Sequence, residues 1–275
     1  MQKLITILQI RGYNYADFYM WLNWYSKFIK CDEIWVCDDA SSYDLRPLIE
    51  LINPNIHYVK RNELDFGKFP GGNQQVKIYN CILAKANPNK DDIIICPDDD
   101  EFWWFDQNKF NSFKDCVNDY RSKLGNTKAL LVPWTLMRSK EVMQNRKQTE
   151  CFAECFTYRA DIDNCEHKPV MFFDGFINTS FHNGYTEART ITEPVNLWYH
   201  SKCKYDLPLR CYHFRFTTVE EYERKKSSDA GTHQPRTNLG KDFLHHYENG
   251  IDQNDKYEIE DLTVKETLSC LDMIF

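Results

Sequence analysis

The chain has 275 residues, and 42% of them are hydrophobic, which is enough apolar material for the core of one large domain and excludes a disordered protein. Its formal net charge of −7 argues against a nucleic-acid-binding protein, because binding to phosphates needs a clustered excess of Lys and Arg. No apolar run approaches the roughly 20 residues of a membrane span, so we expect a cytoplasmic protein without one. The 11 cysteines are odd in number and scattered, as expected for free thiols.

In the first half, short β-rich runs alternate with segments of helical periodicity. The runs are largely apolar and end in polar turns, as expected for strands with both faces buried. Strands that alternate with helices form βαβ units, so the pattern predicts an α/β fold with a Rossmann-type, mostly parallel central sheet flanked by helices. The expected strands are 3–10, 33–37, 56–59 and 92–96, and the expected helices are 15–28, 45–52 and 71–86.

The second half is less regular. Strands are expected at 129–134 and 170–173, and residues 178–210 have the composition of loops. A helix is expected at 218–226, because Thr218 and Glu221 have the spacing of a capping box. The tail after residue 252 is acidic and then apolar, so we expect it to pack back on the body.

Two acidic clusters, Asp38-Asp39 and Asp98–Glu101, follow predicted strands. Ligands of open α/β sheets bind beyond the carboxyl ends of the strands, so both clusters are expected at one edge. Four adjacent carboxylates repel one another, and a hard cation such as Mn²⁺ or Mg²⁺ relieves that repulsion. Alternate residues of an extended chain point the same way, so Asp98 and Asp100 are expected to face one site. The alternative is a solvated acidic turn that caps a helix.

The stretch from Ile93 to Phe102 resembles the DxD motif of GT-A glycosyltransferases, in the D-x-D-E-F form of family-92-like and family-2-like enzymes. The resemblance spans roughly residues 4–230. The compact size and divergence suit a virus-encoded relative, for example from a large algal virus, working in the host cytoplasm. The further matching segments, in order, are Ile10-Arg11, Asp38–Ser41, Gln75–Tyr79 with Cys81, Val132–Trp134, Glu154–Thr157, Lys168-Pro169, His213-Phe214, Glu220–Tyr222 and Lys225.

The resemblance implies a metal-dependent transfer of a sugar from a UDP-sugar to an oligosaccharide or glycoprotein glycan, with inversion as the preferred stereochemistry. It implies one GT-A domain over residues 1–275. Residues 1–128 would form the nucleotide-sugar-binding half, 129–250 an irregular acceptor-binding half, and 251–275 a tail on the body. The implied cofactor is Mn²⁺ or Mg²⁺, and imidazole ligation suits Mn²⁺ better.

The resemblance also implies a role for individual residues. Nucleotide contacts are expected from Asp38, Arg11 and Gln75, and contacts to the ribose or sugar from Asp98 and Asp99. The metal ligands are expected to be Asp98, Asp100 and the late His213, and Arg215 is expected to touch the diphosphate.

Inversion needs a general base that deprotonates the acceptor hydroxyl. Glu154 matches the Glu of the family's Glu-x-Phe segment. Asp174 lies among phenylalanines, a setting that would raise the pKa of its carboxyl group. Glu187 is a third candidate, and the sequence does not separate the three.

Two other functions share parts of this pattern. A sugar-nucleotide nucleotidyltransferase or phosphatase also uses an acidic metal site at a strand end, but it usually carries a Gly-rich or basic phosphate loop near the N-terminus. This chain has only Arg11-Gly12 there. The other alternative is a non-catalytic carbohydrate-binding protein on the same fold, against which the intact acidic run argues.

Overall fold

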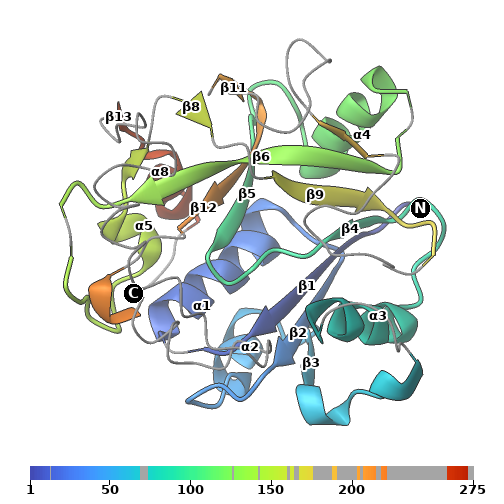
Figure 1. Cartoon of the computed structure of the whole chain (residues 1–275), viewed down its shortest axis with the longest axis horizontal. Coiled ribbons are helices and arrows are strands. Elements are labelled where there is room, and N and C mark those ends of the chain that lie inside the picture. The colour runs from blue at the N-terminus through green and yellow to red at the C-terminus, as the bar shows by residue number, and fades with distance from the viewer. Residues whose placement is uncertain are drawn as a thin grey trace.

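The structure is a computed structural model in which one extended sheet runs through the chain (Figure 1). It describes residues 1–12, 14–68, 74–125, 127–141, 143–159, 162–163, 167–175, 188–190, 203–204, 207–214, 218–221 and 259–271.

The first half forms a parallel sheet whose strands are in the order β3-β2-β1-β4. The two central strands, Leu4–Ile10 and Ile93–Ile95, are buried on both faces, which explains their nearly continuous apolar sequences. The strands are β1 (Leu4–Ile10), β2 (Glu33–Asp38), β3 (His57–Lys60) and β4 (Ile93–Ile95), and the short 3₁₀ turns Arg61–Glu63 and Phe66–Lys68 follow β3.

Helices cover the two faces of this sheet (Figure 1). α1 (Tyr15–Asn23), which continues into a π-helical turn at Trp24–Phe28, packs on one face together with α2 (Arg46–Ile52). α3 (Gln74–Ala86) packs on the other face, against Ile5, Ile7 and Ile94. The predicted α/β class is therefore confirmed, with parallel N-terminal strands flanked by helices.

The second half extends the sheet with strands that pair in both antiparallel and parallel orientation, so the whole sheet is mixed. β9 lies between β4 and β6 and is antiparallel to both. β12 pairs with β5 on one side and β6 on the other. The elements are β5 (Glu101–Phe105), α4 (Phe113–Lys123), β6 (Ala129–Arg138), α5 (Phe152–Cys155), β7 (Tyr158–Arg159), β8 (Ile162–Asp163), β9 (His167–Phe172), β10 (Ala188–Thr190), β11 (Cys203–Lys204), β12 (Leu209–His213), β13 (Ile259–Glu260) and α8 (Thr263–Ser269).

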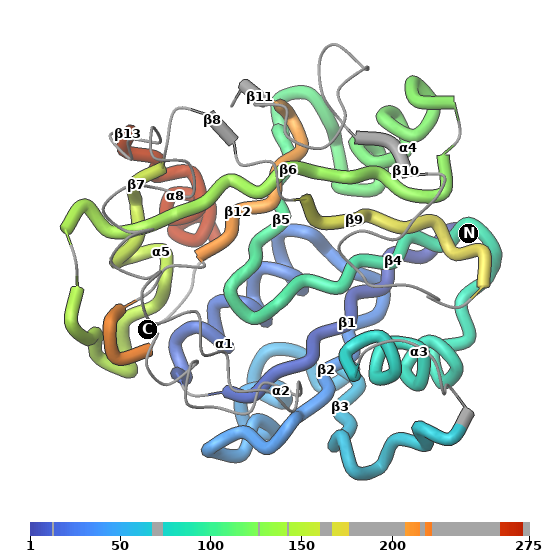
Figure 2. The backbone as a smooth tube through the Cα atoms, in the orientation of Figure 1, coloured from blue at the N-terminus to red at the C-terminus, as the bar shows by residue number. Residues whose placement is uncertain are grey.

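Side chains from the first helix complete the hydrogen bonding of β5. The Tyr25 hydroxyl donates to the Glu101 carbonyl (2.9 Å) and accepts from the Trp103 amide (3.2 Å). Trp24 Nε1 donates to the Trp103 carbonyl at 2.6 Å. Buried backbone groups need such partners, so these aromatic residues fix β5 where the acidic turn enters it. Figure 2 follows the chain from β4 through this bend into β5.

The described cysteine side chains are free thiols, and most are buried. Burial raises the pKa of Cys37 and Cys116 to about 12, so these thiols are inert packing groups. Of the helices that the structure describes, none has both the length and the apolar character to cross a membrane.

The C-terminal segment 259–271 lies against the second half of the domain. β13 pairs with β7, and the Asp261 carboxylate accepts from Arg159 Nε at 2.7 Å and from the Thr263 amide at 3.0 Å. Burial alone would raise the pKa of Asp261, but the hydrogen bonds from Thr263 and Arg159 outweigh burial and lower it.

Replacing Asp261 with Asn is expected to lower the free energy of unfolding by about 1–3 kcal/mol at pH 7. A carboxyl group whose pKa is lowered by folding stabilises the fold above its unfolded pKa, and this stability is lost as pH falls through the folded pKa. The deficit of the variant should therefore shrink below about pH 4. Urea denaturation between pH 7 and pH 3 measures it, with the exposed neighbour Glu260→Gln as control. A deficit that is constant with pH would contradict this interpretation.

Candidate functional site

The carboxyl ends of the parallel strands meet at one edge of the sheet. Ile10 at the end of β1 pairs with Asp38 at the end of β2, and Thr6 of β1 pairs with Ile95 of β4. Both acidic clusters therefore lie at the same edge, as expected from the sequence. We call this edge the acidic rim.

Residues Asp98–Glu101 form a tight turn. The Glu101 amide donates to the Asp98 carbonyl (3.1 Å), and the Asp98 amide donates back to Glu101 Oε2 (2.8 Å). Trp21 Nε1 also donates to the Asp98 carbonyl, at 3.3 Å. The segment was expected to be extended, and this expectation was wrong because the segment is a turn. Alternate residues share a face only in an extended chain. Asp98 and Asp100 consequently have different partners.

The Asp98 carboxylate is held on both oxygens. Gln75 Nε2 donates to Oδ1 at 2.9 Å, and Lys168 Nζ lies 3.1 Å from Oδ2. Gln75 Nε2 also donates to the Tyr79 hydroxyl at 2.8 Å, so the amide is itself fixed. The Asp98 side chain is 31% exposed, so it still faces the outside of the rim. The predicted residues Gln75 and Asp98 are thus in direct contact.

Lys168 is the residue of this site to which the sequence assigned no role beyond its place in the resemblance. Its side chain is 0% exposed, and Nζ lies 2.6 Å from Glu101 Oε2. β9 runs antiparallel to β4 with Ile95 opposite Val170, which places Lys168 beside the turn. The available signal was a lysine directly before an apolar run, Pro169–Phe172.

The charges of this buried group affect one another. Burial would lower the pKa of Lys168, but Asp98 and Glu101 raise it, so the ammonium stays protonated. Burial raises the pKa of Glu101 to about 7 even though Lys168 opposes the shift. Lys168 does not fully offset the effect of burial on Glu101, and the same ammonium group also contacts Asp98.

Asp100 and His213 form a second buried pair at the rim. Their side chains are both 8% exposed, and Asp100 Oδ1 lies 3.4 Å from His213 Nε2, which is longer than a well-formed hydrogen bond. The Phe214 amide donates to the Asp100 carbonyl at 2.9 Å, which connects the end of β12 to the turn. The His213 ring lies 4.4 Å from Trp134. His213 Nδ1 is buried and has no hydrogen-bond partner among the described residues.

The Asp100–His213 pair fits a divalent cation in its chemistry. A carboxylate oxygen and an imidazole nitrogen suit Mn²⁺, and such ions often take their other ligands from substrate phosphates and water. Within the part of the chain that the structure describes, no three His, Cys, Asp or Glu side chains converge as a metal site. The expected third ligand, Asp98, instead binds Lys168 and Gln75. The structure thus brings Asp100 and His213 together and gives Asp98 other partners, and the metal site itself stays a prediction.

Asp38 is half-buried at the end of β2, at the predicted place. Its Oδ2 accepts from the Tyr58 hydroxyl at 2.7 Å, and its Oδ1 accepts from the Ser41 amide at 2.8 Å. Ala40 in the same turn has a φ of 63°, a left-handed conformation that turns the chain sharply. The carboxylate of Asp38 is thereby oriented by its own strand and turn.

The neighbouring Asp39 is held between two arginines. Arg61 Nη1 lies 2.7 Å from Asp39 Oδ1, and Arg11 Nη2 lies 3.3 Å from Oδ2. Arg11 Nε also donates to the Asp39 carbonyl at 2.9 Å. Both guanidinium groups remain partly exposed, so Arg11 lies at the rim, as predicted, with Arg61 as a partner that the sequence did not reveal.

Asp99 is half-buried at the tip of the turn. Its charge acts on Tyr43, whose pKa is raised first by burial and then by Asp17 and Asp99. Asp99 therefore lies close enough to the loop that carries Tyr43 for its charge to act there.

Asp174 is not where the sequence placed it. Because β9 is antiparallel to β4, Asp174 lies beyond Phe172 at the opposite edge of the sheet, roughly 20 Å from the level of Lys168 at ~3.3 Å per residue. It is half-exposed and lies 2.8 Å from Lys128 Nζ, which lowers the pKa of its carboxyl group. The expected apolar setting and raised pKa were wrong, since neighbours in sequence do not determine on which side a strand ends.

The other predicted residues add less. Glu154 is exposed, and its Oε2 accepts from the Cys151 amide at 3.0 Å, so it caps α5. Arg215 and Glu187 lie outside the described residues, as do positions 222–226 of the predicted helix. The capping box of that helix is present, with the Glu221 amide donating to Thr218 Oγ1 at 3.2 Å.

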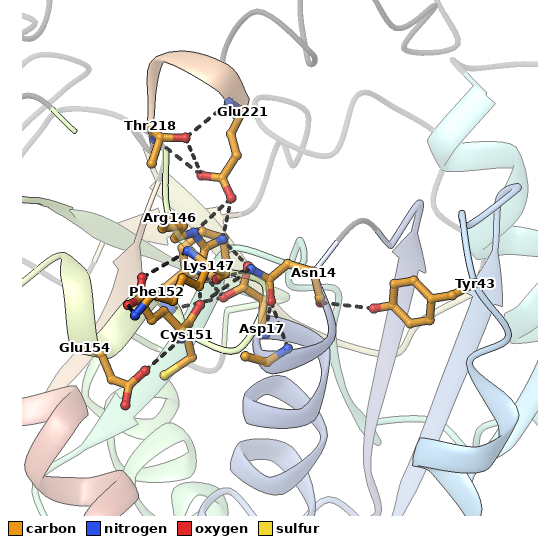
Figure 3. A network of polar contacts seen from close by, with 12 residues as sticks. Asn14, Asp17, Tyr43, Arg146, Lys147, Cys151, Phe152, Glu154, Thr218 and Glu221 are labelled. Atoms are coloured by element: carbon orange, nitrogen blue, oxygen red, sulfur yellow. Dashed lines mark hydrogen bonds and ion pairs between the residues drawn. The ribbon is translucent and has the colours of Figure 1, made fainter. Parts of the chain in front are cut away.

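A buried arginine connects segments that flank the rim (Figure 3). Arg146 is 2% exposed and forms ion pairs with Asp17 of α1 and with Glu221, the latter at 2.6 Å. Its Nη1 also donates to the Glu150 carbonyl at 2.8 Å. We call Asp17, Arg146 and Glu221 the arginine clamp. It ties the start of α1 to the segment that follows β12.

No family model matches this sequence, and no curated protein matches it. Among solved structures, the crystal structure of 4-diphosphocytidyl-2C-methyl-D-erythritol synthase is similar, with a TM-score of 0.33 and 12% identity over 63% of this chain and 75% of that chain. At this level the likeness concerns the fold alone.

Proposed function

We propose that this chain is a metal-dependent glycosyltransferase that moves a sugar from a UDP-sugar to a hydroxyl group of a glycan acceptor. The main support is the buried pair of Asp100 and His213, at the sheet edge where open α/β sheets bind their ligands. A carboxylate oxygen and an imidazole nitrogen that face one another in a buried place are both groups that a divalent cation such as Mn²⁺ accepts as ligands.

In this proposal Asp100 and His213 hold Mn²⁺ or Mg²⁺, which when bound supplies positive charge to the leaving diphosphate. Asp98 lies beside this pair, with its carboxylate fixed and partly exposed. It is suited to accept hydrogen bonds from hydroxyl groups of the ribose or the sugar. Arg11 and Asp38 lie at the ends of the neighbouring strands, where they suit the nucleoside.

Inversion remains our preferred stereochemistry, and it requires a base near the acceptor hydroxyl. The position of Asp174 at the opposite edge removes it from this role. Glu154 is the predicted candidate that remains among the described residues, and Glu187 lies outside them.

The test is a transfer assay with a panel of UDP-sugars and oligosaccharide acceptors in the presence of Mn²⁺. We expect release of UDP together with a glycosylated acceptor, loss of both on adding EDTA, and recovery with excess Mn²⁺. Full transfer in a thoroughly chelated sample would contradict the metal requirement. Release of pyrophosphate from UTP and a sugar phosphate would identify a nucleotidyltransferase instead, and glycan binding without any turnover would identify a binding protein.

A further inference from the structure

Lys168 is a charged residue near the start of a largely buried strand of the sheet. It belongs to β9, between β4 and β6, and pairs with Val132 of β6. Side chains alternate along a strand, so Lys168 points to the same face as Val170 and Phe172, which pack in the main core. An apolar residue would suit packing at this position.

Burial of a lysine is costly unless carboxylates surround it, and here two do. Replacing a buried ion pair by apolar residues is often neutral or stabilising, so stability alone does not account for the pair. The two carboxylates also differ in position. Glu101 is 0% exposed, whereas Asp98 is 31% exposed at the rim.

The three side chains therefore form a connection from the core to the rim. Glu101 Oε2 lies 2.6 Å from Lys168 Nζ and accepts from the Asp98 amide at 2.8 Å. Lys168 Nζ in turn lies 3.1 Å from Asp98 Oδ2. Lys168 is wholly buried and so does not touch a ligand itself, which means that any effect on a ligand passes through Asp98.

We propose that Lys168, anchored by Glu101, is a positioning residue that fixes the Asp98 carboxylate in the orientation that receives hydroxyl groups of the sugar-nucleotide donor. This inference rests on the function proposed above. It explains why a lysine occupies an apolar strand, and why Gln75 holds the other oxygen of the same carboxylate. A ligand group held on two sides in advance loses less freedom when the donor binds.

The test compares two double variants. The variant Lys168→Met/Glu101→Gln removes the buried ion pair without a change in net charge. Asp98 then lacks its ion pair with Lys168, while the electrostatic potential at the acidic rim changes little. The control is Arg159→Met/Asp261→Asn, which also removes a buried ion pair (2.7 Å) but on the C-terminal segment. Thermal melting shows whether both variants fold, calorimetry measures UDP-sugar affinity with Mn²⁺, and crystal structures without ligand show the Asp98 side chain.

We expect the Lys168 variant to bind UDP-sugar about 10- to 100-fold more weakly, by analogy with the loss caused by removing a residue that orients a metal ligand. Its Asp98 carboxylate should be rotated or present in several conformers, while the control retains native affinity and a native Asp98. An unmoved Asp98 in the Lys168 variant would overturn the inference. A rotated Asp98 with undiminished affinity would overturn it as well.

The results for the Lys168 variant and its control can be distinguished from a failure of the proposed function. If the native protein binds no UDP-sugar with Mn²⁺, the proposed function fails. The position of Asp98 in the two variant structures still decides whether Lys168 fixes it.

Discussion

Replacing Arg146 with Met is expected to lower the free energy of unfolding by about 3–5 kcal/mol, because removing one partner from a buried ion group leaves uncompensated charge. The guanidinium is 2% exposed and lies between Asp17 and Glu221. Burial raises the pKa of Asp17 to about 6, and Arg146 opposes that shift. Without the arginine, two buried carboxyl groups must take up protons or move toward water.

Chemical denaturation at pH 7 measures this change, and the adjacent Lys147→Met is the matched control. Lys147 is 80% exposed, so its loss should change stability little. Adding Asp17→Asn and Glu221→Gln to Arg146→Met should recover part of the loss, since neutral partners no longer need the cation. Equal stability of Arg146→Met and the native protein would show that the arginine clamp contributes nothing to the fold.

Asp100→Asn and His213→Gln are each expected to reduce transfer about 100-fold or more. A Lewis acid supplies several kcal/mol of transition-state stabilisation, and each ~1.4 kcal/mol is tenfold in rate. The near-isosteric replacements are needed because both side chains are buried and His213 packs on Trp134. Truncation to Ala would add a cavity to the effect on chemistry.

The matched control is Asp174→Asn, which neutralises an exposed carboxylate at the opposite edge and should leave transfer unchanged. Melting temperatures of all three variants separate catalysis from folding. If Asp100→Asn lost activity only in proportion to lost folded protein, the pair would be structural. If His213→Gln retained metal-dependent activity while Asp100→Asn did not, only the assignment of the histidine would fail.

Local sequence signals predicted the N-terminal half well. β1, β2 and β4 are largely apolar runs that end in polar turns. The burial of a residue such as Ile94 follows from its own apolar side chain, whichever strands lie beside it. The common edge of Asp38 and Asp98 followed from the parallel order alone. These features depend on residues that are close together in the chain.

The parts that the sequence did not predict depend on long-range pairing. β5 follows the acidic turn directly, and it is held by Trp24 and Tyr25 and by pairing with β12, more than 100 residues later in the numbering. The contact of Lys168 with Asp98 arises from the antiparallel register of β9 with β4. The same register places Asp174 at the edge of the sheet opposite the acidic rim, where the sequence did not predict it. Periodicity reveals neither the direction of a strand nor its partner.

The central claim is that the acidic rim binds the diphosphate of a sugar nucleotide through a cation held by Asp100 and His213. Calorimetric titration of UDP-sugar into the native protein and into Asp100→Asn, each with Mn²⁺ and again with EDTA, tests it most directly. We expect tight binding only for the native protein with Mn²⁺, and equally weak binding in the other three titrations. Native binding that is as tight in EDTA as in Mn²⁺ would contradict the claim.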